Sequence, residues 1–214
     1  PGIRRVRSAL DQNLIGNVHS LHSDFFMGCH FGGFREEMKH VLLMDMAIHT
    51  FDQARFLMGK RCLSVIASEW NPPGSWYRHG ASALAQFEVE EGGVYSYRGS
   101  WCAEGLKTSW ESSWRIIGEY GTMLWDGGDG IQVEVADGMD KDGLFHSVQS
   151  LEAPFPKEEM KYTLHAGGIR NFINCLNSGQ EPETPAHDNL HSLAMVHGAL
   201  ASAESGCRIQ LSNI

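Results

Sequence analysis

The chain has 214 residues, 42% of them hydrophobic, which is enough for a globular domain with its own core. Its 17 Lys and Arg against 26 Asp and Glu leave a net charge of −9, which disfavours binding to nucleic acid and to anionic membranes. The apolar runs, such as residues 41–44, are far shorter than the ~20 residues of a membrane span, so we expect a soluble protein.

Two further features concern the origin of the chain. Its five cysteines include no C-x-x-C pair, which favours a reducing compartment, the cytoplasm. It begins with Pro-Gly rather than Met, so we expect a fragment or a processed product.

The first half predicts one strand and one long helix. Residues 17–27 have β-type composition, and the Gly-Cys-His-Phe-Gly-Gly stretch that follows is typical of a loop. From about residue 39 to 58, apolar residues recur at spacings of three and four, which predicts a helix. Gly59 stands where a C-terminal cap belongs.

The second half predicts antiparallel strands and then two helices. Alternation over residues 83–89 and 95–101 indicates a hairpin, and residues 114–125 and 131–135 indicate a second pair in an antiparallel meander. Residues 160–176 and 188–205 are expected to be helical, and 207–211 to form a last strand. The predicted class is α+β, with residues 1–214 forming one domain.

A stripe of ionisable residues marks the first long helix. Asp45, His49 and Asp52 stand at i, i+4 and i+7, which on an α-helix lie within roughly 60° of arc. A carboxylate beside an imidazole fixes its tautomer and stabilises its charged form, so the stripe could serve general acid–base catalysis. Two other readings stay open on spacing alone. The stripe could be a solvated face of an ordinary helix, or it could hold a divalent ion.

Other motifs give weaker signals. His187 and His191 have the spacing of a zinc helix, but Asp188 stands where that signature needs Glu, and helix-start chemistry explains the group. Gly128-Asp129-Gly130 leads into a strand, so it is not a dinucleotide loop. Several tryptophans, among them Trp70, Trp76, Trp101 and Trp110, could form a stacking wall for a sugar or could simply pack a core. No G-x-S-x-G elbow supports a serine hydrolase.

Four segments together resemble the C-terminal domain of the glucose–fructose oxidoreductase, inositol dehydrogenase and rhizopine-catabolism (Gfo/Idh/MocA) family. They are RRVRSALDQNLIGNVHSLHSDF at 4–25, FREEMKHVLLMDMAIHTFDQARFLMG at 34–59, IIGEYGTMLWDG at 116–127, and the closing region 171–211. The second contains a D-x-x-x-H-x-x-D pattern similar to the family's helix. Coverage is nearly complete and the segments occur in the family's order.

The resemblance implies half of an NAD(P)-dependent oxidoreductase that acts on a sugar, an inositol or a related polyol. Asp45 and His49 match the family's catalytic pair. His49 would take the proton of the substrate hydroxyl while hydride leaves for the nicotinamide, and Asp45 would orient the substrate or the imidazole. Candidate substrate contacts are Arg35, Lys39, His40, Asp52 and His165.

The resemblance also implies an architecture and its partners. We expect a large, mainly antiparallel sheet with helices on one face, as in dihydrodipicolinate-reductase-like C-terminal domains. The chain carries neither the family's Rossmann half nor its Glu-Lys-Pro motif, so by itself it should neither bind NAD or NADP tightly nor turn over. We assign no cofactor-binding or metal-binding residues. The open sheet face is expected to pair in a homo-oligomer, with Ile131, Val133 and Val135 as apolar candidates.

Two alternatives to an enzyme half are considered. One is a non-catalytic sugar-binding or oligomerisation module derived from the same family. A pure scaffold of this kind would bind neither polyol nor NAD even when the missing half is restored. The other is a metal-dependent hydrolase, which predicts stoichiometric zinc.

Overall fold

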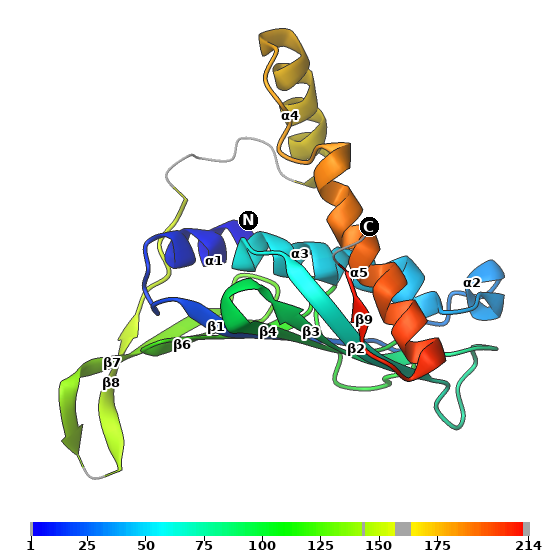
Figure 1. The fold of residues 1–214 in the computed structure, drawn as a ribbon, viewed down its shortest axis with the longest axis horizontal. Helices are drawn as coiled ribbons and strands as arrows, with labels where there is room; N and C mark the ends of the chain where they lie inside the picture. The colour runs from blue at the N-terminus through cyan, green and yellow to red at the C-terminus, as the bar shows by residue number, and fades with distance from the viewer. Residues whose placement is uncertain (1, 143, 157–163, 212–214) are drawn as a thin grey trace.

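A large sheet carries a layer of helices on one face. The computed structural model describes residues 2–142, 144–156 and 164–211. The described helices are α1 (Gly2–Asp11), α2 (Phe34–Glu37), the π-helical turn η1 (Leu42–Ala47), α3 (Ile48–Met58), the 3-10 turn η2 (Glu90–Gly92), α4 (Leu164–Ser178) and α5 (Ala186–Ser205). Figure 1 shows α1 and α3 lying over one side of the sheet, while α5 leans against β2 and β9.

The sheet has nine strands in the order β8-β7-β6-β5-β1-β4-β3-β2-β9. Their bounds are β1 (Val18–Phe26), β2 (Cys62–Trp70), β3 (Ser82–Val89), β4 (Gly93–Ser100), β5 (Ser113–Gly118), β6 (Gly121–Trp125), β7 (Ile131–Asp142), β8 (Phe145–Leu151) and β9 (Ile209–Gln210). The fold is therefore the predicted α+β class with a large, mostly antiparallel sheet.

The topology differs from a simple meander at the β9 edge, where β9 pairs with β2, and in the middle of the sheet. β1 lies between β4 and β5 and runs parallel to β4, with Leu21 opposite Tyr95 and Phe25 opposite Gly99. The predicted β3–β4 hairpin lies on one side of this insertion. On the other side, the segment 114–125 that was expected as one member of a pair forms two paired strands, β5 and β6, and β6 pairs with β7 as expected. Because β1 sits in the middle of the sheet, the loop that follows it and the loop that follows β4 leave the sheet side by side, joined by the Gly28–Cys102 bridge.

An aromatic core joins α3 to the sheet. The ring of Phe51 packs edge-on against Phe87, Tyr95 and Tyr97, with centroids 4.9, 6.1 and 5.3 Å away. All four side chains are buried, and edge-to-face packing of this kind adds to the gain from burying their area. α3 is therefore fixed firmly against β3 and β4.

The end of α3 confirms one prediction and shows a contact that the sequence did not indicate. Gly59 caps the helix in the left-handed conformation, with φ 63°. Arg7 of α1 donates hydrogen bonds to the carbonyls of Phe56 and Leu57, which belong to the last turn of α3. The sequence patterns indicated neither α1, α2, β2 nor β8. The expected helix start at residue 160 lies outside the described residues.

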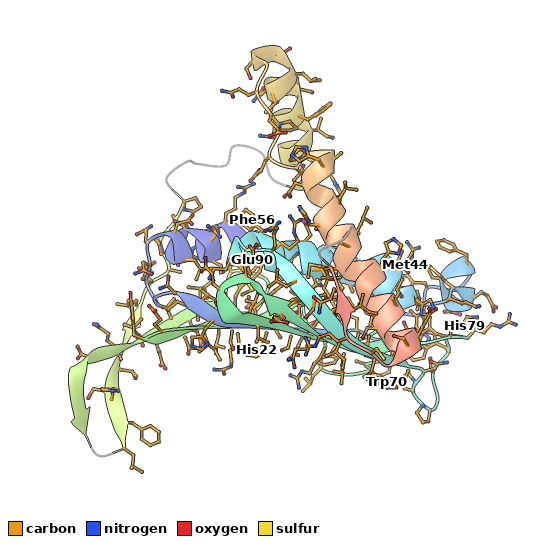
Figure 2. The ribbon with its side chains drawn as sticks, viewed as in Figure 1. His22, Met44, Phe56, Trp70, His79 and Glu90 are labelled. Atoms are coloured by element: carbon orange, nitrogen blue, oxygen red, sulfur yellow. The ribbon has the colours of Figure 1, made fainter. Side chains whose placement is uncertain are left out.

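The sheet face opposite the helices is open, and the expected apolar candidates are not on it. Val133 and Val135 are buried on the helix side of the sheet. Ile131 points to the same side of β7 and is half-buried. This prediction was wrong because alternation separates two faces of a strand without saying which one the helices cover. The open face carries His22, which Figure 2 shows on the side opposite Phe56.

Two parts extend from this body. α4 projects away from the sheet, and the outer ends of β7 and β8 form an arm beyond the sheet edge (Figure 1). In the described part of the chain, no helix combines the length and apolarity that a membrane crossing requires.

Candidate functional site

The helix that carries the predicted stripe begins with a widened turn. Leu42–Ala47 is π-helical and continues directly into α3, so Asp45 lies inside the π turn and His49 at the start of the α-helical part. Short π-helical segments inside α-helices are frequent at functional sites. The stripe is therefore not the regular α-helical ladder that the spacing predicted.

Asp45, His49 and Asp52 nevertheless line one hollow. This hollow has a volume of about 620 Å³. Its walls are Phe31, Arg35, Asp45, Met46, His49, Asp52, Gln53, Trp101, Trp110 and Glu111. It lies between the π turn and α3 on one side and the loops after β1 and β4 on the other.

The Asp45 carboxylate is held by Arg35. Arg35 Nε donates a hydrogen bond to Asp45 Oδ2 at 2.9 Å, and the side chain of Asp45 is 25% exposed. The guanidinium also lies over the rings of Phe31 and Phe34, 5.2 and 4.9 Å from their centroids. The hydrogen bond to Asp45 raises the pKa of Arg35, so this cation stays charged beside the carboxylate.

His49 is exposed and unengaged. Within the described residues its imidazole has no hydrogen bond or ion pair, and Asp45 is bonded to Arg35 rather than to it. An accessible imidazole without an internal partner can bond to a ligand and can exchange a proton with it.

The Asp52 carboxylate is held by Ser192 and Arg55. Its Oδ1 accepts a hydrogen bond of 2.6 Å from Ser192 of α5, whose side chain is buried, and lies 3.4 Å from Arg55 Nη1. Arg55 in turn bonds to Ser192 and to Asp188. Asp52 thus ties α3 to α5 while it borders the hollow.

The structure places His40 away from the hollow. Its Nδ1 bonds to Glu69 Oε2 at 2.6 Å, and its Nε2 lies 3.4 Å from Glu204 Oε1. Its backbone has φ 55°, the left-handed region that non-glycine residues rarely adopt. Burial raises the pKa of Glu69, and the hydrogen bond from His40 opposes that shift.

Two other candidate residues are also placed elsewhere. Lys39 is exposed in the turn before the helix, and His165 is exposed on α4, which projects away from the sheet (Figure 1). Neither lines the hollow. The hollow therefore gathers Arg35, Asp45, His49 and Asp52 of the seven candidates.

The tryptophans divide in the same way. Trp101 and Trp110 line the hollow, whereas Trp76 stacks on His30 at 3.7 Å and Trp70 is half-exposed on β2.

No group of three possible metal ligands occurs in residues 2–142, 144–156 and 164–211, which gives the zinc readings no support there.

Several residues of the hollow were not predicted as a site. Gln53 stands four residues after His49, so extending the stripe by one turn would have found it. Phe31 and Glu111 come from loops that only the sheet order brings to α3, and no local pattern marks them. The complete arrangement offers an imidazole, several carboxylates and aromatic surface in one hollow, which suits a polyhydroxylated ligand.

Comparison with known proteins supports the relationship at the level of sequence and fold. The C-terminal alpha/beta domain of the oxidoreductase (Gfo/Idh/MocA) family matches residues 7–211. An uncharacterized protein of Sinorhizobium fredii is 26% identical over 215 residues, covering 94% of this chain and 56% of that protein.

Solved structures share the fold. An oxidoreductase from Agrobacterium radiobacter in complex with NAD+, L-tartaric acid and magnesium matches with TM-score 0.77 and 21% identity, over 98% of this chain and 61% of that one. A putative myo-inositol dehydrogenase from Sinorhizobium meliloti matches with TM-score 0.74 and 22% identity, over 99% and 62%. A levoglucosan dehydrogenase in complex with NADH matches with TM-score 0.76 and 15% identity, over 100% and 64%.

The chain thus spans between about half and two thirds of the length of these relatives. The match over residues 7–211 covers nearly all of it, and the nine-stranded sheet agrees with that match. The chain belongs to the Gfo/Idh/MocA oxidoreductase family, as its C-terminal alpha/beta domain.

Proposed function

We propose that this chain is the substrate-binding and proton-transferring half of an NAD(P)-dependent oxidoreductase that acts on a sugar, an inositol or a related polyol. The observation that carries the proposal is the unengaged imidazole of His49 in the same hollow as Asp45. The relatives described as a myo-inositol dehydrogenase and a levoglucosan dehydrogenase support the substrate class.

In this proposal His49 removes the proton of the reacting hydroxyl. A histidine near neutral pH can accept a proton and give it back, which is the requirement for reversible alcohol oxidation. Asp45, whose carboxylate is fixed by Arg35, accepts a hydrogen bond from the substrate and sets its orientation. Arg35 and Asp52 border the bound polyol, and Asp52 mainly holds α3 to α5.

The Gly128-Asp129-Gly130 motif is not arranged as a dinucleotide loop. In Gly128-Asp129-Gly130, the amides of Gly128 and Gly130 both donate to Asp126 Oδ1, at 2.7 and 3.1 Å, so they are not free to bind phosphate. β1 and β4 form the only parallel strand pair among the described strands. A nicotinamide dinucleotide, NAD or NADP, would accept the hydride and would be held by a separate Rossmann domain.

The cysteines suggest the compartment in which the domain works. All five are unpaired, which favours a reducing compartment such as the cytoplasm.

The open sheet face suggests a contact between copies of the chain. Three apolar side chains on β2 and β3, Ile66, Trp70 and Leu84, are 41–44% exposed, and we infer that they contact a second copy. A Leu84→Lys variant should lower the mass measured by light scattering, and an unchanged mass would contradict this inference.

Steady-state kinetics of the chain joined to its Rossmann domain test the proposal. His49→Ala should lower kcat by about 10²- to 10⁴-fold, the usual contribution of a general base. KM for the polyol should change much less, because His49 acts on the proton. His187→Ala, an exposed histidine outside the hollow, is the matched control. Full turnover in the His49→Ala variant would contradict the proton-transfer role.

A further inference from the structure

Trp110 occupies an unusual position in the hollow. Its side chain is 53% exposed although tryptophan has a large apolar area, and it lines the same hollow as His49 and Asp45. One side of the ring is supported, since its centroid lies 5.9 Å from that of buried Trp101 and 6.3 Å from that of Phe25. The remaining indole surface is free to meet a ligand.

The loop that carries Trp110 is fixed to the helix that carries His49. The hydroxyls of Ser112 and Thr50 are 3.2 Å apart and buried, and Thr50 directly follows His49. One turn later, the amide of Gln53 donates a hydrogen bond to the carboxylate of Glu111.

A third contact holds the loop from the sheet. Trp114 Nε1, on β5, donates to the carbonyl of Glu111 at 2.6 Å. On the other side of Trp110, the backbone amide of Thr108 donates to the carbonyl of Phe26 at 3.0 Å. The loop is therefore tied on both sides of Trp110, and the distance between the indole and the imidazole is set by the fold rather than by a mobile loop.

The hollow thus combines an aromatic wall with a polar wall. The carboxylates of Asp45, Asp52 and Glu111 can accept hydrogen bonds from hydroxyl groups. The indole favours an apolar surface. A closed ring of carbons bearing hydroxyls offers both, because its C–H bonds gather on the faces and its hydroxyls point outward. An open-chain polyol presents such a face only after losing rotational freedom.

We propose that Trp110 is a specificity-determining residue that stacks on the carbon face of a ring-shaped polyol and so selects cyclic over open-chain substrates. This inference rests on the proposed function, because it assumes that the hollow binds a polyol. It adds a preference that Asp45 and His49 do not account for, since they read hydroxyl groups and not ring closure.

The test uses two ligands that share their carbon number and hydroxyl number and differ in ring closure, myo-inositol and D-sorbitol. Each is titrated into the 214-residue chain, and binding is followed by NMR shifts of His49 and by tryptophan fluorescence. The intact chain should bind myo-inositol about tenfold more tightly than D-sorbitol. Trp110→Leu should remove that preference by weakening myo-inositol, and Trp110→Phe should restore most of it.

Controls keep the outcomes separate. Trp70→Leu removes a tryptophan of similar exposure, 43%, from β2, and it should leave both affinities unchanged. Far-ultraviolet circular dichroism checks that each variant is folded. Equal binding of the two ligands by the intact chain, or equal loss of both in Trp110→Leu, would overturn the stacking role and leave the polyol function standing. If neither ligand shifts His49, the stacking role and the proposed function both fail.

Discussion

Two histidines nine positions apart, His40 and His49, are in opposite situations. His40 has a strong carboxylate partner at 2.6 Å, a second carboxylate at 3.4 Å and a left-handed backbone. His49 is exposed and has no partner in the described part of the chain. The difference teaches that a histidine beside acids serves structure when the acids occupy it, and is available for chemistry when they do not.

The surroundings explain the difference. Glu69 reaches His40 from β2 with a side chain only 9% exposed, so its charge depends on that imidazole. In the hollow, Arg35 is paired with the Asp45 carboxylate, so His49 is left without an acidic partner. The same residue types therefore form a partly buried cluster just before the helix, His40 with Glu69 and Glu204 (the clamp), and leave an accessible imidazole nine residues further along.

The largest expected effect is a loss of stability when the clamp, His40 with Glu69 and Glu204, is broken. His40→Ala should lower the free energy of unfolding by about 2–4 kcal/mol, because it leaves Glu69 mostly buried without its partner. His49→Ala should change it by less than about 0.5 kcal/mol, as is usual for an exposed group without internal contacts. Urea unfolding of the two variants measures both changes in free energy. Similar losses of stability in the two variants would contradict the contrast between His40 and His49.

A second effect concerns the anchored and the accessible aspartate. Ser192→Ala should cost about 1–2 kcal/mol, because the buried Ser192 hydroxyl bridges Asp52 and Arg55. Asp45→Asn should cost less, since Asp45 is partly exposed and an amide oxygen can still accept from Arg35. If Asp45→Asn proves the more destabilising variant, Asp45 has a structural role and the contrast with Asp52 is lost.

A smaller effect separates the side chain of His40 from its backbone. Glycine adopts φ 55° without the ~1 kcal/mol penalty of other residues, so His40→Gly should be about 1 kcal/mol more stable than His40→Ala. Thermal unfolding of the two variants in the same buffer measures the difference. Equal stability would mean that the left-handed backbone carries no strain.

The smallest effect is a pH dependence. Burial raises the pKa of Glu69 above its value in the unfolded chain, so the folded protein holds this proton to higher pH. This group therefore favours folding at low pH, and its contribution is lost as pH rises from about 4.5 through the raised pKa. Glu69→Gln removes the effect, so the stability of the wild type relative to this variant should fall across that range. A flat or rising difference in urea midpoints between pH 4 and 7 would contradict it.

The sequence predicted the parts of the site that lie on one element. Asp45, His49 and Asp52 share a helix, and their spacing was enough to place them on one side of it. The π turn at Leu42–Ala47 was not predicted, because its apolar residues also suit a regular α-helix. The left-handed backbone of His40, which directs its side chain towards Glu69, left no signal in the sequence either.

The parts that depend on the sheet order stayed hidden. Trp110 and Glu111 reach His49 only because β1 is inserted beside β4 and β5, a parallel pairing that no local pattern encodes. The burial of Val133 and Val135 was also predicted wrongly, because it depends on which face of the sheet the helices cover. The strand and helix patterns predicted the α+β class, and the family resemblance added the large sheet with helices on one face. Which residues lie next to one another across the sheet came only from the structure.

The central claim is that the hollow around His49 is a polyol site and that the clamp around His40 is not. The most direct measurement is a titration of the chain with myo-inositol, followed by NMR of the histidine ring protons. The signals of His49 should shift with saturation while those of His40 stay in place. Shifts at His40 with none at His49, or no saturable shift at either ring, would contradict the account.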